Sequence, residues 1–131
     1  MAEALNPDGA PKPASRYVQA VRHGAGAERL VISGQIGVDR EGRIAEGLEA
    51  QMEQAWRNLV AVIEGAGFRR SDLVKVVIYM TAPGDVALYR TVRDRMLEGH
   101  LAATTLVIVA GLASPALLFE VEGEAVREDR M

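Results

Sequence analysis

LEAQMEQAWRNLVAVIEGA (residues 48–66) and LVKVVIYMT (residues 73–81) are the two stretches that decide the fold. In the first, apolar residues recur every three or four positions, which predicts an amphipathic helix of about five turns that stops at Gly65 and Gly67. The second is almost continuously apolar and rich in β-branched residues, which predicts a strand with both faces covered. A long helix followed closely by such a strand indicates a sheet with helices packed on it.

The segments toward the N-terminus predict two more strands. Residues 16–23 and 29–36 are rich in β-branched residues and are separated by glycines, which predicts a β-hairpin with a loop longer than two residues. Gly34 and Gly37 interrupt the second strand, as is typical of a bulge or of a close backbone approach.

Toward the C-terminus, Asp85 is a suitable N-cap for a second helix, and residues 104–109 and 117–126 predict the last two strands. The element order is then β-β-α-β-α-β-β, which predicts an α+β fold in which one sheet carries two helices on a single face. Residues 1–15 are rich in proline and glycine and show no apolar period, so we expect a flexible lead-in before a single domain over residues 16–128.

Two helices cover only one face of such a sheet, so the other face must meet something else. In the strand at 73–81, alternation groups Leu73 with Lys75 on one side and Val74 with Val76 on the other, and neither side is plainly polar. A closed homo-oligomer in which the open faces pack together would bury this surface. The pattern therefore predicts an oligomer rather than a monomer.

The composition excludes several classes of protein. Cysteine is absent from the 131 residues, which excludes disulfides and zinc ribbons and permits a reducing compartment. His23 and His100 are too far apart in sequence to suggest a metal cluster, and a net charge of −3 argues against a nucleic-acid binder. No stretch approaches ~18 consecutive apolar residues and the N-terminus lacks a signal-peptide pattern, so we expect a cytoplasmic protein without membrane contact.

An ordered set of short motifs between Tyr17 and Val126 resembles the RidA (YjgF/YER057c) family of small trimeric proteins. No single motif is diagnostic, but their order and spacing follow the family pattern. The matching segments are Tyr17-Val-Gln-Ala20, Ser33-Gly-Gln-Ile36 followed by Asp39, Gln51 with Asn58-Leu59, Ala66-Gly67, Asp72-Leu-Val-Lys75 leading into Tyr79, Asp85, Val109-Ala-Gly-Leu112 and Phe119-Glu-Val-Glu122.

The resemblance implies a chorismate-mutase-like fold and a homotrimer whose sheets face inward as a barrel, with small-molecule ligands in clefts between subunits. Active members of the family hydrolyse reactive 2-imino acids, such as 2-iminobutanoate and 2-iminopropanoate, to 2-keto acids and ammonia, without a metal or an organic cofactor. In that scheme an arginine in a Pro-Ala-Arg motif binds the substrate carboxylate. A tyrosine, a glutamate and backbone groups near a Ser-Gly-Gln segment surround the imine and the attacking water.

The same resemblance assigns roles to individual residues. Glu120 matches the family's glutamate and is expected to act as an acid–base group or to orient water, the alternative being an ordinary solvated strand face. Tyr17 is expected to contact the ligand, or else to be an ordinary half-buried strand tyrosine. Ser33 and Gly34 match the Ser-Gly segment. Since no histidine or lysine matches a position that could activate Ser33, we expect it to form a hydrogen bond at the cleft rather than to act as a nucleophile.

The arginine of the family is missing from this chain. The corresponding segment reads HLAATTLV, residues 100–107, and places either Thr104 or Ala103 at the arginine position. Thr104 offers one neutral hydroxyl and Ala103 offers nothing, whereas each hydrogen bond to a charged group is worth ~1.5–3 kcal/mol. Arg90 and Arg93 belong to the second predicted helix and are expected outside the barrel. The loss argues against ordinary deaminase activity.

Three functions therefore remain open from the sequence. The first is a protein that binds a small metabolite in clefts between subunits, with altered or absent hydrolase activity. The second is an active imine deaminase that uses a substitute basic residue, and the third is a non-catalytic chaperone-like or regulatory interaction protein. Ribonuclease activity, which is attached to some relatives, is disfavoured because the chain lacks a basic patch, a histidine pair and stacking aromatic residues.

Overall fold

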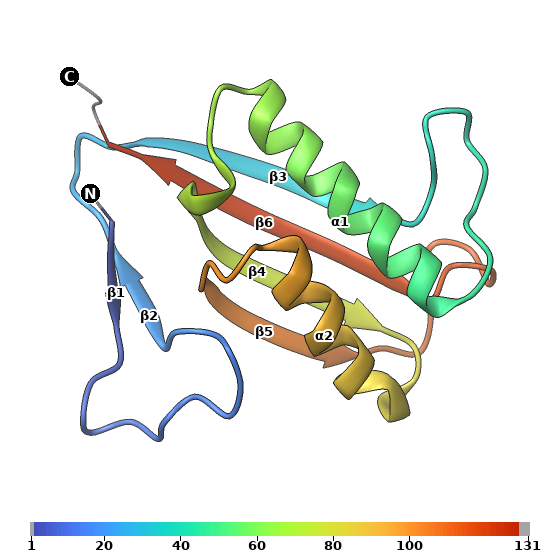
Figure 1. Cartoon of the computed structure of the whole chain (residues 1–131), viewed down its shortest axis with the longest axis horizontal. Helices are drawn as coiled ribbons and strands as arrows, with labels where there is room; N and C mark the ends of the chain where they lie inside the picture. Colours follow the sequence, from blue (N-terminus) through green and yellow to red (C-terminus); the bar gives the residue numbers. More distant parts are fainter. Residues whose placement is uncertain (1, 129–131) are drawn as a thin grey trace.

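Four strands form the main sheet of the structure, a computed structural model that describes residues 2–128. They are β3 (Glu28–Ile36), β4 (Leu73–Met80), β5 (Ala103–Ile108) and β6 (Phe119–Arg127), in the spatial order β3-β6-β4-β5. Strand β6 pairs antiparallel with β3 and β4, whereas β4 and β5 run parallel. Helices α1 (Leu48–Gly65) and α2 (Val86–Met96) lie side by side on one face of this sheet (Figure 1). The predicted α+β class, with both helices on one face, is confirmed.

Two short 3-10 helices complete the connections. The first, η1 (Arg70–Asp72), precedes β4, and the second, η2 (Pro83–Asp85), precedes α2. Parallel strands need a long crossover, and η2 with α2 provides it between β4 and β5. Within residues 2–128, neither long helix has the length and apolar character needed to cross a membrane.

The core lies between the helices and the main sheet. Many of its members are fully buried and come from α1, β4 and β6, among them Met52, Trp56, Leu59, Ile63, Val76, Ile78, Phe119 and Val121. The three- and four-residue spacing of the α1 residues puts them on one stripe that faces the sheet. Burying one such side chain stabilises the folded state by ~1.5–3 kcal/mol, so this stripe holds α1 in place.

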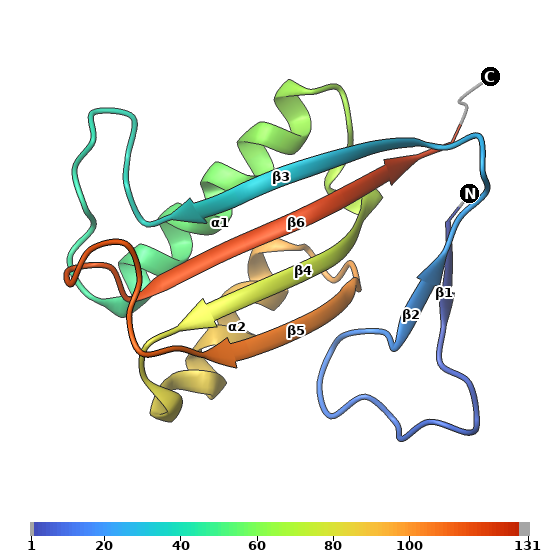
Figure 2. The same ribbon diagram turned by 180° about the vertical axis from the view of Figure 1, so that it is seen from behind.

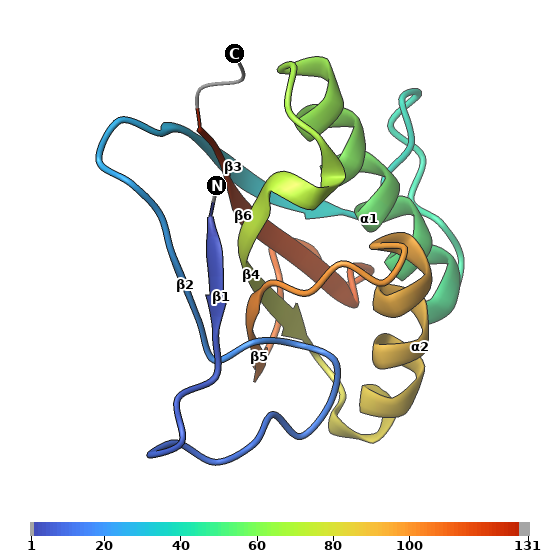
Figure 3. The ribbon, with the colours of Figure 1, turned by 60° about the vertical axis from the view of Figure 1, so that its left-hand side comes forward.

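The N-terminal strands leave the main sheet, and the predicted hairpin is wrong. Strand β2 (Ala20–Arg22) pairs antiparallel with β1 (Glu3–Leu5), not with β3. Strand β1 lies within residues 1–15, the segment that the sequence analysis described as a lead-in before the domain. Figure 3 shows this two-stranded sheet on the side of the main sheet that faces away from the helices.

Hydrogen bonds that precede β2 explain this arrangement. The backbone N–H of Val18 donates to the carbonyl oxygen of Ala102 at 3.2 Å, beside the start of β5. The backbone N–H of Gln19 donates to Asn6 Oδ1 and its side-chain amide donates to Pro11 O, both at 2.8 Å. These bonds draw the chain toward β5 and the N-terminal segment. A run of β-branched residues predicts a strand, but it does not choose the partner.

Strand β6 alternates between the core and the open face, as the two-residue period of its sequence indicates. Phe119 and Val121 have 0% exposure against the helices, whereas Glu120 and Glu122 are partly exposed on the opposite face. Figure 2 shows this open face, which no helix covers.

Strand β4 needs one correction. A register shift between Leu73 and Lys75 breaks the simple alternation, so Leu73 packs in the core with Val76. Val74 is only partly buried, and it contributes to cavities beneath the N-terminal sheet rather than to the core. Two-residue periodicity fails at such a shift because one extra residue exchanges the two faces of the strand. Here Leu73 and Val74, before the shift, lie on the faces opposite to those expected from Val76.

One buried amide ties two loops to α1. Gln51 is 2% exposed, and its Nε2 donates to the carbonyl oxygens of Ala45 at 3.1 Å and Ala116 at 2.9 Å. Its Oε1 accepts a hydrogen bond from Leu118 N at 2.8 Å. A Cβ atom at Gly37 would lie 2.6 Å from Gln51 Cα, so only glycine allows β3 to run this close to α1.

Replacing Gln51 with leucine is expected to lower the free energy of unfolding by about 2–4 kcal/mol, because backbone groups that it now pairs would be left buried without partners. Urea denaturation measures this loss. Gln54→Leu on the same helix is the matched control, because Gln54 binds only the Asn58 side chain, at 2.9 Å. Equal losses for the two variants would show that the backbone bonds of Gln51 are not what matters.

Candidate functional site

Three glutamates follow one another along the open face of β6, and only one of them is free. Tyr79 donates its hydroxyl to Glu122 Oε1 at 2.7 Å, and this bond raises the pKa of Tyr79 above its ordinary value. Arg29 donates to Glu124. Glu120 makes no hydrogen bond or ion pair within residues 2–128. Its carboxylate is therefore the one available to a ligand or a water molecule.

The strand next to Glu120 has a glycine, and therefore no side chain, at the position beside the carboxylate. A register shift between Ile32 and Gln35 leaves Ser33 and Gly34 as a bulge in β3. A Cβ atom on Gly34 would lie only 1.9 Å from Glu120 Oε2, so the carboxylate rests where any other residue would place its side chain. The Ser33 hydroxyl makes no hydrogen bond within the described residues, while its carbonyl oxygen accepts one from Gln35 Nε2 at 3.0 Å. The structure thus brings together Ser33, Gly34 and Glu120.

A second group of polar residues surrounds a cavity of about 230 Å³ between β5 and α2. Two of the predicted site residues, Tyr17 and Thr104, line it. Its full lining is Ser15, Tyr17, Val86, Tyr89, Arg90, Arg93, Thr104 and Leu106.

Ala103 lies elsewhere. It pairs in register with Lys75, and both line a separate cavity of about 360 Å³ on the other side of β5, together with Glu124. Lys75 Nζ donates to Thr105 Oγ1 at 3.0 Å on that side. Of the two positions that the sequence left open for the missing arginine, Thr104 is the one that shares a cavity with Tyr17.

Two arginines of α2, Arg90 and Arg93, line the cavity beside Thr104. Arg90 is exposed and makes no hydrogen bond or ion pair within the described part of the chain. Arg93 is 2% exposed, an uncommon environment for a charged side chain. Position 104 carries no charge, but the same cavity is cationic.

Arg93 is held on several sides. Its Nε donates to Asp94 Oδ1 at 2.9 Å, and its Nη1 donates to Ser15 Oγ at 3.4 Å. Its guanidinium carbon lies 5.4 Å from the centre of the Tyr89 ring, within the range of a cation–π interaction. Its Nη2 lies 2.9 Å from Asp94 Oδ1 but makes no hydrogen bond, and the buried Tyr89 hydroxyl has none either.

The sequence analysis missed Tyr89 and Arg93. A signal was present, because Tyr89 and Arg93 are four residues apart and both are buried with Val92 on one side of α2. A charged residue on the apolar stripe of a helix indicates a buried ion or a binding site. The sequence analysis placed this helix outside the barrel and did not consider whether its arginines are buried.

The two groups of residues lie apart in a single chain. The first half-site, Ser33, Gly34 and Glu120, is at the β3–β6 pair, and the second half-site, around Tyr17, Arg93 and Thr104, is at the β5–α2 edge. Strands β3 and β5 are the two outer strands of the main sheet, as Figures 1 and 2 show. One copy of the chain therefore places these two groups of residues toward opposite edges of the main sheet.

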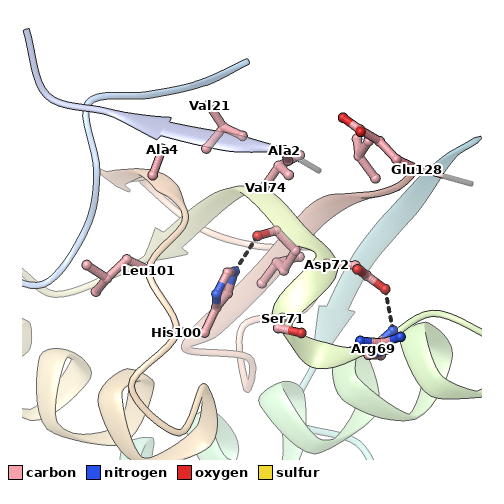
Figure 4. Close-up of a pocket in the computed structure, with 12 residues that line it drawn as sticks. Ala2, Ala4, Val21, Arg69, Ser71, Asp72, Val74, His100, Leu101 and Glu128 are labelled. Carbon is pink, nitrogen blue, oxygen red and sulfur yellow. Dashed lines mark hydrogen bonds between the residues drawn. The ribbon is translucent and has the colours of Figure 1, made fainter. Parts of the chain in front are cut away.

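A third cavity, of about 430 Å³, lies between the N-terminal sheet and the main sheet (Figure 4). His100 lines it, and its Nε2 forms a hydrogen bond with Leu73 O at 2.7 Å. The backbone N–H of Arg69 donates to Asp72 Oδ2 at 2.6 Å. These polar groups are thus engaged in local structure. Within residues 2–128, no cluster of three or more metal-ligating side chains exists here or elsewhere.

The burial of Tyr89 has a consequence that pH can test. Burial raises the pKa of Tyr89 to about 12, against the lowering effect of the Arg93 guanidinium. Because the unfolded chain loses this proton first, the contribution to stability is complete below about pH 10 and is lost as the pH rises toward the folded value.

Between about pH 8 and about pH 11, wild type is therefore expected to lose about 1.4 kcal/mol of unfolding free energy that Tyr89→Phe does not lose. Urea denaturation of both proteins at the two pH values measures the difference. An identical loss in both would show that Tyr89 titrates normally in the folded chain.

Comparison with known proteins gives the family. A sequence model of the family described as Endoribonuclease L-PSP matches residues 8–127. A RutC family protein of Pyrococcus horikoshii is 32% identical over 130 residues, which are 98% of this chain and 100% of that protein. The 2-iminobutanoate/2-iminopropanoate deaminase of Salmonella typhimurium is 32% identical over 131 residues, 97% of this chain and 99% of that enzyme.

Solved structures agree. The Yersinia pestis protein YyfB, described as a protein of unknown function of the conserved Rid family, has a TM-score of 0.86 at 28% identity and covers 95% of this chain and 97% of its own. The Escherichia coli YjgF gene product has a TM-score of 0.73 at 28% identity, with 96% and 99% covered. The chain therefore belongs to the RidA/YjgF family, whose sequence model carries the description Endoribonuclease L-PSP.

Proposed function

We propose that the protein hydrolyses small 2-imino acids in clefts formed between copies of the chain. The observation that carries this proposal is the free carboxylate of Glu120, placed against the bare backbone of Gly34. Full-length relatives named 2-iminobutanoate/2-iminopropanoate deaminase support it. The guanidinium groups beside Thr104 answer the objection that the site has no positive charge, because they line the same cavity.

In the proposed reaction, water adds to the imine carbon, the C–N bond breaks, and a 2-keto acid and ammonia are released. Glu120 accepts a proton from the attacking water and passes it to the imine nitrogen, which gives a carbinolamine. The carbinolamine hydroxyl then loses its proton, again by way of Glu120, to the nitrogen as the C–N bond breaks and the C=O bond forms. The absence of a side chain at Gly34 lets the planar substrate approach the carboxylate and the backbone. Tyr17 and Ser33 contribute hydroxyl groups that orient the substrate. The reaction needs no metal and no organic cofactor.

The oligomer follows from the split site. A half-site on each outer edge of the sheet is joined when the β5 edge of one copy meets the β3–β6 region of the next, which is a heterologous contact that can close into a ring. Proteins of this family are commonly oligomeric, and we propose the homotrimer that the resemblance implies. Val31 and Val107 are 65% and 39% exposed on β3 and β5, so assembly would also cover apolar surface.

Ribonuclease activity fits this surface poorly. The open face carries Glu120, Glu122 and Glu124 in one row, and the chain has a net charge of −3. A phosphate backbone is attracted by basic surfaces and repelled by such a row. A non-catalytic interaction role would be favoured if purified protein failed to accelerate imine hydrolysis at all.

Glu120→Gln is expected to reduce the catalysed rate by about 10²–10⁴-fold, because the amide cannot accept the proton. The assay generates 2-iminobutanoate with an amino-acid oxidase and follows 2-ketobutanoate formation above spontaneous hydrolysis. Glu124→Gln is the matched control, since Glu124 is paired with Arg29 and should keep its rate. No acceleration by wild type would refute the hydrolase, and equal rates for both variants would refute the role of Glu120.

A mixing experiment tests whether a cleft spans two chains. Glu120→Gln and Tyr17→Ala each damage one half-site, so each protein alone is expected to be inactive. Random co-assembly in equal amounts leaves about a quarter of the clefts with two intact halves, and so should restore about a quarter of wild-type activity. Co-expression with two affinity tags isolates the mixed oligomer, and light scattering gives its size. In an isolated mixed trimer one cleft in three has two intact halves, so the purified mixed protein should show about a third of wild-type activity. Activity no greater than that of the parents would place both halves in one chain.

A further inference from the structure

Two buried groups at the β5–α2 cavity have hydrogen-bonding capacity that is not used. Arg93 and Tyr89 are each 2% exposed. Arg93 Nη2 forms an ion pair with Asp94 Oδ1 at 2.9 Å, but neither Nη2 nor the Tyr89 hydroxyl makes a hydrogen bond. Both residues line the same cavity. In native proteins the great majority of buried polar groups have partners, and an exception calls for an explanation such as a missing ligand or water.

We propose that Arg93 and Tyr89 form the anion subsite of this cavity and bind the carboxylate of a small ligand. The subsite rests on the proposed function only in that the ligand is a small acid. It assigns to helix α2 the positive charge that position 104 on strand β5 lacks.

The charge around the cavity favours an anion. Its lining contains Arg90 and Arg93 and neither aspartate nor glutamate. Asp94 forms an ion pair with Arg93, with its Oδ1 2.9 Å from both Nε and Nη2, yet it is not part of the lining. Arg90 has no counter-ion within the described residues, so the cavity keeps a net positive charge. A guanidinium and a hydroxyl offer two donors, which matches the two oxygens of a carboxylate.

Thr104 cannot serve as the anchor. Its hydroxyl donates to the carbonyl oxygen of Ala102 at 3.0 Å, and a hydroxyl has a single hydrogen to give. What remains at Thr104 is an acceptor, which a carboxylate does not bind. The donors for an anion in this cavity must therefore come from α2 or from Tyr17.

Arg93 is also preorganised for binding. Asp94 and Ser15 fix two of its nitrogen atoms, and the ring of Tyr89 lies under the guanidinium. A side chain that is already ordered loses little conformational entropy when a ligand binds. An exposed lysine or arginine would lose far more.

The size of the cavity narrows the ligand class. At about 230 Å³ it is smaller than the ≈300–1,000 Å³ typical of sites for drug-sized molecules. Val86 and Leu106 supply apolar walls. The arrangement suits a monocarboxylic acid with a short alkyl chain, such as a 2-keto or 2-imino acid of a few carbons.

Binding is measured by titration calorimetry with 2-ketobutanoate, a stable acid that needs no turnover, and with 2-butanone, which lacks the carboxylate. Wild type should bind the acid and not the ketone. Arg93→Gln should weaken binding about 10- to 100-fold, the range for a charge-assisted hydrogen bond. Arg95→Gln is the matched control on the same helix, because Arg95 pairs with Glu53 and does not line the cavity.

Two further variants keep the test decisive. Tyr89→Phe removes only a hydroxyl without a partner, so it should fold normally and still weaken binding by about 3- to 10-fold. If Arg93→Gln fails to fold, the affinity of Tyr89→Phe for 2-ketobutanoate still shows whether the subsite binds the acid. Thr104→Arg in the Arg93→Gln background returns a guanidinium to the cavity from β5 and should recover most of the lost affinity.

Each outcome separates this inference from the proposed hydrolysis. Folded Arg93→Gln and Tyr89→Phe proteins with wild-type affinity would overturn the subsite, as would a wild type that does not bind 2-ketobutanoate and holds only water there. Acid binding that depends on Arg93, without any acceleration of imine hydrolysis, would refute the hydrolase and leave the subsite standing. Hydrolysis at the wild-type rate in both variants would refute the subsite alone.

Discussion

Residues of strand β6 alternate between the buried core and the open face of the sheet. Because β6 lies between β3 and β4, this alternation also fixes which face each residue of those two strands occupies. Phe119 and Val121 are fully buried against the helices, while Glu120 and Glu122 stand on the other face. Moving an unpaired carboxylate into the core costs several kcal/mol, so a slip of one residue is not tolerated. Because β6 pairs with both β3 and β4, its register decides which of their residues reach the core and which reach the open face.

The same alternation shapes the site. Glu122 and Glu124 find partners in Tyr79 and Arg29, and Glu120 does not, because the neighbouring strand bulges there and offers Gly34 in place of a side chain. The bulge is thus what separates a free carboxylate from two paired ones. The second half-site lies between β5 and α2, on the helix side of the sheet. Under the proposed function, a catalytic unit built from both halves would make assembly a condition of activity.

The sequence predicted those features that depend on local periodicity. The amphipathic pattern over 48–66 and the alternation in β6 each follow from one physical demand, that apolar residues face the core. The strand partner of β2 was not predictable in this way, because bonds made by Val18 and Gln19 to distant segments decide it. The place of Leu73 was missed because a register shift reverses a two-residue period.

The candidate site was predicted in part for the same reason. The motif resemblance located Glu120 and Gly34, and the structure then showed that the Glu120 carboxylate makes no hydrogen bond or ion pair within the described residues. The contribution of Arg93 could not come from a motif, since the family pattern expects its arginine on β5 and this chain presents one from α2. Only the three-dimensional packing of α2 against β5 puts Arg93 and Thr104 around one cavity.

An arginine on α2 differs from the family's arginine on β5 in what its burial costs the folded state. Arg93 is buried on α2, where Tyr89, Asp94 and Ser15 contact it, and its Nη2 and the Tyr89 hydroxyl still make no hydrogen bond. Each such donor costs about 1–3 kcal/mol. A ligand that supplies the acceptors removes that cost, and because it binds only the folded chain it stabilises the fold as it binds. Burial of the anchor thus couples occupancy of the cavity to the stability of the α2–β5 edge, which is also the edge that the proposed assembly uses.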